Sequence, residues 1–413
     1  MSDLIPEGWS ETSIGELTKN DSLFNDGDWV ESKDQDPNGK NRLIQLADIG
    51  DGWFINKSSR FLNDEQFERL KCTKLEKGDI LVARMPEPLG RACIYPLDNV
   101  RAATIVDIAI IRTPNADHKW LTSAINSSDY RSNIELNASG TTRTRIARGA
   151  LAKLKLLAPP LPEQQKIAAI LTSVDEVIEK TQAQIDKLKD LKTGMMQTLL
   201  TKGVGIDGKP HTEFKDSPVG RIPKGWGVVN LIEIANNLDS KRVPIKSVDR
   251  ASMQGQYRYY GASGVIDYVD DYIFDGEFIL LGEDGENVIS RNSPLAFIVK
   301  GKFWVNNHAH VLTPKENMNI RFLCEYLEFL DYKNIASGSA QPKITKGALN
   351  TIKIPVPELS EQIRIGDILK SIDDKSIKVI SKSEMLRATK KALMQDLLTG
   401  KVRVNVSSEA TGH

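Results

Sequence analysis

Cysteine is scarce in this sequence: the 413 residues include three, Cys72, Cys93 and Cys324, and none has CxxC spacing. This argues against a disulfide scaffold or a structural zinc site and predicts a reducing, cytoplasmic location. Long apolar runs are also missing, since stretches such as Ile105–Ile111 fall far short of the ~20 residues that cross a bilayer. The start, MSDLIPEGW, has no basic flank or apolar stretch and does not predict a signal peptide.

Net charge is absent too, because 55 basic residues balance 55 acidic ones. This balance counts mildly against a nucleic-acid binder, which is often basic overall, but it leaves room for local imbalance. Apolar residues at 40% and charged residues at 27% are ordinary for a globular protein. At ~150 residues per domain, the length predicts two or three domains.

Catalytic signatures are lacking. No Gly-rich cofactor loop follows a strand, and no Asn-Pro-Pro-aromatic run for base methylation is present. His308 and His310 share one face of a predicted strand, but two ligands are too few for a metal site. We therefore expect no catalytic residue, metal or cofactor in this chain. Glu283, Asp284 and Glu286 occupy a Gly-rich loop, which leaves a nuclease site as an alternative to a simple turn.

An internal repeat is present instead. Residues 138–203 align without a gap on residues 336–401 at a shift of 198, and 25 of the 66 positions are identical, against roughly four by chance. A second anchor, Pro-x-Gly-Trp, ends at Trp9 and Trp226, at a shift of 217. The regions between the anchors show no convincing similarity. Each copy thus has a constant start, a divergent middle and a constant end. We interpret the divergence as a sign that the two middles recognise different targets.

The divergent middles are predicted to be rich in β-strands. Short apolar runs punctuated by Gly and Pro indicate strands, and one helix is expected to follow in each copy, near residues 120–136 and 320–335. The predicted strands are Leu43–Leu46, Trp53–Ile55, Ile80–Ala83, Ala92–Tyr95, Ile105–Ile111, Phe278–Leu281, Leu295–Val299, Phe303–Val305 and Ala309–Leu312.

The constant ends predict two long helices. From Ile167 to Leu199, and from Ile365 to Leu397, apolar residues recur every three then four positions, the period of a coiled coil. The simplest partner for each apolar stripe is the other helix, and a pseudo-two-fold axis makes the pair antiparallel. The alternative is that each helix packs on its own domain. Polar seam positions can fix the register: Thr181, Lys192, Ser376, Ser383 and Lys390.

A basic stretch without acids precedes each long helix, at residues 140–155 and 338–353. Lys and Arg neutralise phosphates, and Arg also pairs with guanine in the major groove. Further candidates for reading base edges are amides, hydroxyls, aromatic groups and Arg in the middles. The candidate DNA-binding residues are Lys57, Arg60, Arg84, Arg91, Arg143, Arg145, Arg148, Tyr257, Tyr260, Ser263, Arg291, Asn306, His308, Gln341 and Lys343.

These paired motifs resemble the specificity subunit of type I restriction–modification systems. The resemblance rests on both Pro-x-Gly-Trp settings, the run PLPEQQKI at 160–167, its partner ELSEQIRI at 358–365, and the Leu-Leu-Thr helix ends. YGASG at 260–264 followed by GEFILLG at 276–282 is also similar to many target-recognition domains of that family. The likeness spans essentially the whole chain.

The resemblance implies an α+β fold with two target-recognition domains separated by two long antiparallel helices, with an internal pseudo-two-fold repeat. The expected divisions are 1–160 for the first domain, 161–203 for the central helix, 204–357 for linker and second domain, and 358–413 for the distal helix and tail. Each domain would read half of a split site in double-stranded DNA. The helices would act as a ruler and dock two methyltransferase subunits, and restriction–translocase subunits would join for cleavage.

The implied cofactors, S-adenosylmethionine, ATP and Mg²⁺, belong to the partner subunits, and no membrane is involved. Three alternatives remain open at this point: the specificity part of a combined restriction–methyltransferase enzyme, a nuclease, and a coiled-coil adaptor without DNA contact.

Overall fold

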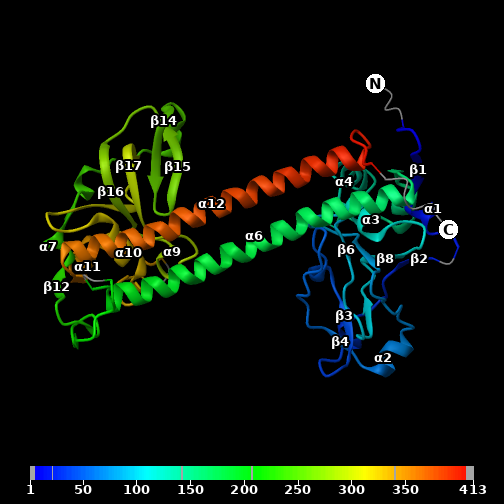
Figure 1. The fold of residues 1–413 in the computed structure, drawn as a ribbon, viewed down its shortest axis with the longest axis horizontal. Helices are drawn as coiled ribbons and strands as arrows, with labels where there is room; N and C mark the ends of the chain where they lie inside the picture. Colours follow the sequence, from blue (N-terminus) through cyan, green and yellow to red (C-terminus); the bar gives the residue numbers. More distant parts are fainter. Residues whose placement is uncertain (1–4, 21, 141–142, 206–207, 339–340, 406–413) are drawn as a thin grey trace. The chain divides into compact units, whose positions relative to one another are not determined.

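The computed structural model describes residues 5–20, 22–140, 143–205, 208–338 and 341–405. The chain divides into two compact units: unit 1 holds Met1–Gln182 and Lys382–His413, and unit 2 holds Ala183–Ser381. Two long helices, α6 (Leu161–Lys202) and α12 (Leu359–Leu398), each begin in one unit and end in the other (Figure 1). The divisions predicted at 160 and 357 fall beside the first residues of these helices, whereas the compact units divide within them. No helix among the described residues is long and apolar enough to span a membrane.

Unit 1 contains the first globular domain. Its elements before α6 are β1 (Ser10–Ser13), α1 (Ile14–Leu17), β2 (Leu23–Asp26), η1 (Ser32–Asp34), β3 (Asn41–Ile44), η2 (Leu46–Asp48), β4 (Phe61–Leu62), α2 (Asp64–Arg69), β5 (Ile80–Ala83), β6 (Ala92–Ile94), β7 (Ala102–Thr104), β8 (Ile108–Arg112), α3 (His118–Ile125), α4 (Ser128–Leu136), α5 (Arg148–Lys153) and β9 (Lys155–Ala158).

Unit 2 contains the second globular domain. Between α6 and α12 it has β10 (Phe214–Lys215), β11 (Ile222–Pro223), β12 (Gly227–Asn230), α7 (Leu231–Ile234), β13 (Ala235–Asn237), η3 (Asp239–Lys241), α8 (Ser247–Ala251), β14 (Gln254–Gly261), β15 (Gly264–Val269), β16 (Phe274–Gly282), α9 (Asn287–Ser290), β17 (Ala296–Val305), β18 (Ala309–Pro314), α10 (Ile320–Phe329), α11 (Lys346–Asn350) and β19 (Lys353–Val356).

The divergent middles share one sheet topology although their sequences do not match. The first domain has strand orders β2-β8-β5-β6 and β4-β3-β7, and the second has β13-β18-β16-β17-β14-β15. Strand β17 takes the place of both β6 and β7: it pairs antiparallel with β16, as β6 does with β5, and parallel with β14, as β7 does with β3. The two domains are therefore versions of one α+β fold, continuous in one copy and split into two sheets in the other.

The constant segments enter and leave each domain through a short two-stranded sheet. Strand β1 pairs antiparallel with β9, and β12 pairs antiparallel with β19. Ser10 faces Ala158, and Gly227 faces Val356, so the two pairings keep the same register across the repeat. This stem joins the Pro-x-Gly-Trp anchor to the start of the long helix.

Four expectations need correction. The strand expected at 53–55 is an isolated bridge between Ile49 and Phe54. The single helix expected near 120–136 is two helices, because the Ser127 hydroxyl caps α4 by accepting the Tyr130 amide at 3.3 Å. The two strands expected at 295–299 and 303–305 form one strand, β17, in which Gly301 has a φ of 82°. The hairpin β14–β15 was not predicted, since its mixed aromatic and polar residues do not form an apolar run.

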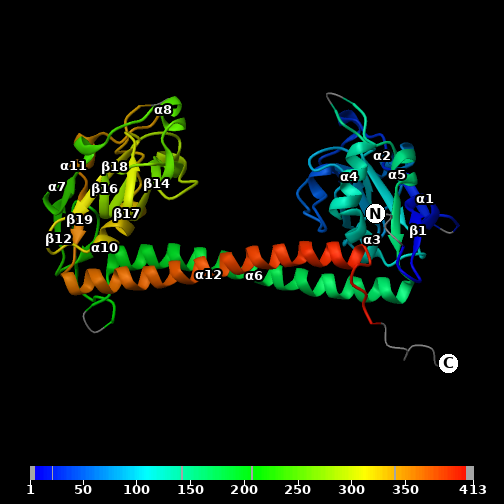
Figure 2. The ribbon, with the colours of Figure 1, turned by 90° about the horizontal axis from the view of Figure 1, so that it is seen from above.

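Each long helix packs on the other and on a domain. All ten predicted seam positions of α6, from Ile167 to Leu199, are buried or half-buried, and the same holds for α12 from Ile365 to Leu397. In unit 1, Asp175 pairs with Lys390 at 2.6 Å, and in unit 2, Lys192 pairs with Asp373 at 2.7 Å. In unit 1, Glu163 near the start of α6 also contacts Arg403, which follows α12. In unit 2, Glu361 near the start of α12 accepts the backbone N–H of Val204, which follows α6, at 2.9 Å. Within each unit the numbers thus rise on one helix as they fall on the other, so the helices run antiparallel there (Figure 2).

The ends of the helices also enter the domain cores. Leu171 and Leu397 lie in the cluster of unit 1 that contains Trp120. Leu199 and Leu369 lie in the cluster of unit 2 that contains Phe322. Both interpretations of the apolar stripe thus hold in part, since the helix ends pack on their domains as well as on each other.

Candidate nucleic-acid interface

The Glu-Gln pair at the start of each long helix links that helix to its domain. The Trp9 indole N–H donates to Glu163 Oε2 at 3.1 Å, and the Trp226 indole donates to Glu361 Oε2 at 3.0 Å. A basic side chain from a distant segment closes each contact: Arg403 Nε lies 2.8 Å from Glu163 in unit 1. In unit 2, His211 Nε2 lies 2.9 Å from Glu361.

The glutamine of the pair holds the neighbouring helix of the domain. Gln164 accepts the backbone N–H of Asp117, at the start of α3, at 2.9 Å and donates to Pro159 O at 2.9 Å. Gln362 accepts from Asn319, at the start of α10, at 2.8 Å and donates to Pro357 O. The sequence shows these identities, but their role as a mount for the domain became visible only with the tertiary contacts.

The basic stretch forms the same closed loop in both copies. Ser139 and Arg145 exchange two backbone hydrogen bonds of 3.0 and 2.9 Å, and Ser337 and Lys343 do the same at 2.9 and 2.8 Å. Gly140 and Gly338 have φ values of 105° and 90°, a backbone conformation that favours glycine. We call residues 139–145 and 337–343 the basic loops; residues 141–142 and 339–340 within them lie outside the described residues.

Each basic loop is fastened to the end of a central strand of its domain. Ile146 N donates to Arg84 O, directly after β5, at 3.1 Å. Ile344 N donates to Glu283 O, directly after β16, at 2.7 Å. Because β5 and β16 occupy equivalent places in their sheets, the loop that carries the repeated positive charge sits at the same end of both domains.

Two further connections reach this end of the second domain. The β17–β18 turn joins it, because Glu283 N donates to His308 O at 2.8 Å. The β14–β15 turn joins it as well, since a Cβ built on Gly282 would lie 2.7 Å from Ala262 O. In the first domain the corresponding segments are the β7–β8 turn and the β3–β4 connection. We call this end of each domain the reading end.

The structure distributes the candidate DNA-binding residues over three classes of exposure. Eight are exposed: Lys57, Arg60, Arg143, Arg148, Ser263, His308, Gln341 and Lys343. Three are half-buried: Arg145, Tyr257 and Arg291. Four are buried: Arg84, Arg91, Tyr260 and Asn306. In the second domain, Ser263, His308 and Lys343 come together at the reading end.

The buried candidates have partners inside the protein. Arg84 Nη2 lies 3.0 Å from Asp26 Oδ1, and Arg91 Nε donates to Ile49 O at 2.7 Å. The Tyr260 ring packs edge-on against Phe303. Asn306 accepts the backbone N–H of His308 at 2.8 Å and thereby shapes the β17–β18 turn. These contacts give the four side chains structural roles, whereas direct DNA contact by any of the fifteen candidates stays a prediction.

Half-buried Arg291 also has an internal partner. Its Nη2 lies 2.8 Å from Glu328 Oε1, and its guanidinium lies over the Tyr332 ring at 5.8 Å from the centroid. It follows α9 with a φ of 54°. The structure therefore places Arg291 between α9 and α10, where it joins the two helices.

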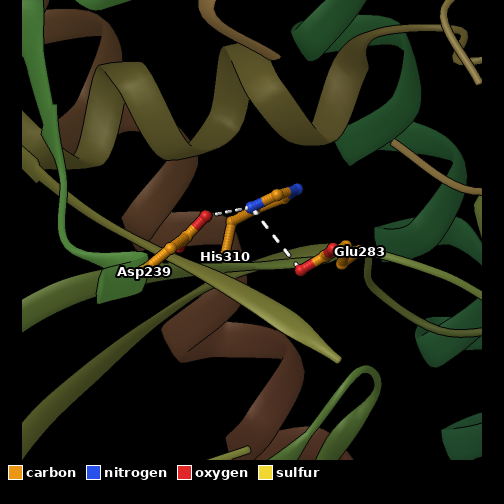
Figure 3. A group of neighbouring side chains, drawn as sticks. All are labelled: Asp239, Glu283 and His310. Atoms are coloured by element: carbon orange, nitrogen blue, oxygen red, sulfur yellow. Dashed lines mark hydrogen bonds and ion pairs between the residues drawn. The ribbon is translucent and has the colours of Figure 1, made fainter. Parts of the chain in front are cut away.

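A buried charge network supports the reading end of the second domain. His310 Nδ1 lies 2.6 Å from Asp239 Oδ2 and 3.8 Å from Glu283 Oε2, and Figure 3 shows the imidazole between both carboxylates. Arg242 Nη1 contacts Glu283 at 2.6 Å, and Lys343 Nζ contacts its other oxygen at 3.1 Å. Glu283 thus ties the basic loop to the domain interior.

Burial alone would raise the pKa of Glu283, but the hydrogen bonds from Arg242 and Lys343 and the charge of His310 lower it overall. Burial acts likewise on Asp239, and the contact with His310 reverses the effect, so that its pKa is also lowered. These ligand types suit a divalent cation, and their donor atoms lie within 4.8 Å of one another. Here, however, side-chain cations of the protein already contact the same carboxylates.

Two of the three acids considered for a nuclease, Glu283 and Asp284, have basic side-chain partners, and the third, Glu286, is exposed. Glu283 contacts Arg242 and Lys343, and both oxygens of Asp284 lie 2.9 Å from His308 Nδ1. The first domain has basic Arg84 at the place of Glu283. The two reading ends therefore share a scaffold and differ in the charges beneath it.

Comparison with known proteins agrees with this architecture. The family model of the type I restriction modification DNA specificity domain matches residues 6–190 and 223–384, one match for each copy of the repeat. The chain belongs to this family. A specificity subunit of the family works in an assembly with other subunits and DNA.

Relatives of this specificity family match along most of the chain. The putative type I restriction enzyme MjaX specificity subunit of Methanocaldococcus jannaschii is 32% identical over 383 residues, covering 88% of this chain and 87% of that protein. A putative specificity subunit of Haemophilus influenzae is 42% identical, but over 34% of this chain and 36% of its own length. The crystal structure of the S subunit from M. genitalium has a TM-score of 0.61 at 18% identity, over 94% of this chain and 96% of that one, and shows the same fold.

Proposed function

We propose that the two domains of this specificity subunit each read one half of a bipartite site in double-stranded DNA. The observation that carries the proposal is the repeated basic loop. It closes in the same way in both copies, sits at the same end of the same sheet topology, and is mounted on unlike surfaces. The shared attachment of the basic loops would give both domains similar contacts to phosphates. The different surfaces of the two reading ends would contact different bases.

Charge at the second reading end supports DNA contact. Lys343 and His308 are both exposed while carboxylates hold them in place, so their donors are positioned before a ligand arrives. Arg143 of the first basic loop is exposed, and no ion pair is found for it among the described residues. Such groups suit phosphates or the acceptors on guanine.

We propose that the subunit is itself non-catalytic and directs two methyltransferase subunits, which the long helices would dock. Restriction–translocase subunits would join the same assembly. S-adenosylmethionine, ATP and Mg²⁺ would serve those partners. The same subunit in a combined restriction–methyltransferase enzyme would use its reading ends in the same way.

We further propose that the helices set the gap between the two half-sites. Helix α6 passes from one unit to the other without interruption, and its 42 residues correspond to about 63 Å at 1.5 Å rise per residue. Reading the same face of DNA twice requires centres about 34–36 Å apart. A rigid element of this length can set such a spacing.

Methylome sequencing of a host that carries the complete system tests both proposals. We expect a methylated motif of two unlike halves around a gap. Insertion of one helical turn at equivalent positions in α6 and α12 should lengthen the gap and leave both half-sequences unchanged. An undivided motif would contradict the bipartite proposal, and an unchanged gap in an active variant would contradict the ruler.

Alanine substitution of Arg143 separates the two kinds of DNA contact. If its contact is to phosphate, binding should weaken alike for all sequences and the salt slope should shrink by about one. If it contacts a base, one position of the motif should relax, at about 1–3 kcal/mol. Unchanged affinity and salt slope would remove Arg143 from the interface.

A further inference from the structure

Trp53 is a large apolar side chain that the first domain leaves in solvent. It is 58% exposed, and its neighbour Ile55 is 47% exposed. Trp9, Trp120, Trp226 and Trp304 are buried, and Trp29 alone is comparably exposed. Among the described residues no hydrogen bond is found for the indole N–H of Trp53. Tryptophan is enriched at interaction surfaces, because its ring is apolar while its N–H can donate a hydrogen bond.

The segment that carries Trp53 belongs to the reading end. It is the β3–β4 connection, and in the shared topology this connection corresponds to the β14–β15 turn, which contains Ser263. Gly52 N donates to Ala92 O at 2.9 Å, at the start of β6. Ala92 pairs with Val82 near the end of β5, and the basic loop is fastened to Arg84 directly after β5. The segment that carries Trp53 and the basic loop are therefore attached at the same end of the sheet.

A buried carboxylate fixes this connection from beneath. Asp48 is fully buried, and its two oxygens accept the Ser58 backbone N–H at 2.7 Å and the Gln45 backbone N–H at 2.8 Å. Ile55 N donates to Asp48 O at 2.8 Å. The exposed side chains between Gly52 and Ser58 are therefore carried by a backbone that is held at both ends.

The charge around Trp53 suits a polyanion. Lys57 and Arg60 are exposed, and no ion pair is found for either among the described residues. The acid in the same segment, Asp51, accepts hydrogen bonds from Nη1 and Nη2 of Arg131, at 3.1 and 2.7 Å. Trp29 lies in the opposite setting, since residues 26–36 contain five acids and one lysine.

We propose that Trp53 is a specificity-determining residue that stacks on, or wedges beside, a base of the DNA half-site read by the first domain. Lys57 and Arg60 would hold the flanking phosphates. This inference rests on the proposed DNA-reading function. Apolar wedges and aromatic platforms act on base steps in this way, and loss of one stacked base lowers affinity about tenfold or more.

The test compares Trp53→Ala with Trp29→Ala in the full chain assembled with its methyltransferase subunits. Fluorescence anisotropy would measure binding to duplexes that carry the motif found by methylome sequencing and to scrambled duplexes. We expect Trp53→Ala to weaken binding to the motif at least tenfold, Trp29→Ala to change it less than twofold, and Trp53→Phe to restore most of the loss. The methylome of the Trp53→Ala strain should relax in the first half-site and keep the second.

The possible failures can be told apart. If the unaltered complex does not distinguish motif from scrambled DNA, the proposed function fails. If it does, but Trp53→Ala behaves like Trp29→Ala, the inference about Trp53 alone is overturned. Size-exclusion chromatography would show whether the Trp53→Ala chain still binds its partner subunits. If most of the chain elutes without them, but the fraction that is still assembled keeps its DNA affinity, Trp53 belongs to a protein interface. That result would also overturn the inference about Trp53.

Discussion

At the scale of single residues, Glu283 joins the interior of the second domain to its surface. Its carboxylate is buried, yet it contacts Lys343 of the basic loop as well as Arg242. The sequence points to Glu283 only as an acid in a Gly-rich loop, because its cationic partners lie far away along the chain. The buried arginines, Arg84 and Arg91, adjoin apolar strand residues in the sequence, whereas the exposed Arg143 lies among threonines and another arginine. Residue type alone does not show that the first two bind partners inside the protein.

We predict that Glu283→Gln lowers the free energy of unfolding of the chain at pH 7 by about 3 kcal/mol, because the half-buried guanidinium of Arg242 loses its buried carboxylate partner. Glu277→Gln, on the strand β16 that leads to Glu283, is the matched control, since the Glu277–Lys300 pair is exposed and should contribute less than about 1 kcal/mol. Urea unfolding followed by circular dichroism would measure both. Equal losses in the two variants would contradict the assigned role.

The pH dependence follows from the lowered pKa of Glu283. A carboxyl whose pKa is lower in the folded state stabilises the fold above the ordinary value of 4.5 and loses this contribution as the pH falls through its folded pKa. We therefore expect the chain to lose stability on acidification below about pH 4.5, and Glu283→Gln to reduce this loss. An unchanged acid slope in the variant would show that other groups dominate.

At the scale of elements, the two long helices are the part of the fold that the sequence predicts best. The three-four spacing of apolar residues depends on local periodicity, and the seam positions it identifies are buried or half-buried. The strands are predicted where the sequence has an apolar run, as at Ile80–Ala83, and missed where tyrosines and polar residues are mixed, as at Tyr257–Tyr260. The shared sheet topology was beyond sequence reasoning, because strand order is set by long-range pairing rather than by composition.

A lysine on each helix tests how the helices are held. In unit 2, Lys192 contacts Asp373 at 2.7 Å and buried Glu325 at 3.4 Å. We predict that Lys192→Met destabilises the chain by about 3 kcal/mol, because two carboxylates lose a buried counter-charge. The equivalent Lys390→Met should cost less than about 1 kcal/mol, since its partner Asp175 is half exposed. Thermal unfolding of both variants would measure the difference, and equal effects would contradict the prediction.

Glu325 adds a second readout to that experiment. Burial raises its pKa, and the nearby Asp373 adds to the effect while Lys192 opposes it. Without Lys192, the folded state should bind a proton at Glu325 still more tightly. Lys192→Met should therefore regain stability as the pH falls from 7 toward 5, and Glu325→Gln in the same chain should remove that regain.

At the scale of the whole molecule, the chain is one scaffold used twice. The stems β1–β9 and β12–β19 have the same register, and both are fastened by a Trp–Glu hydrogen bond. The sequence repeat predicts this duplication directly, because the constant segments kept their residues. The surfaces at the reading ends differ between the copies. The sequence repeat does not predict them, because the segments that form them do not align with each other.

Replacing the segment between β1 and β9 by the segment between β12 and β19 should therefore give a folded chain with two copies of the second reading end. We predict that a host carrying this variant with its partner subunits methylates a motif whose two halves are inverted copies of one sequence. Methylome sequencing would show the symmetry. A variant that folds but retains the original unlike halves would show that specificity lies outside the exchanged segment.

The contact of Arg403 with Glu163, together with its 2.8 Å hydrogen bond to the carbonyl of Glu7, brings the first and last described segments of the chain against the same helix start. A short peptide could join these two segments, and the backbone could be opened instead in the stretch after α6, without cutting either domain. The order of the two repeats along the chain is then not required for the fold. A circularly permuted gene should encode a subunit with the same fold and the same DNA specificity.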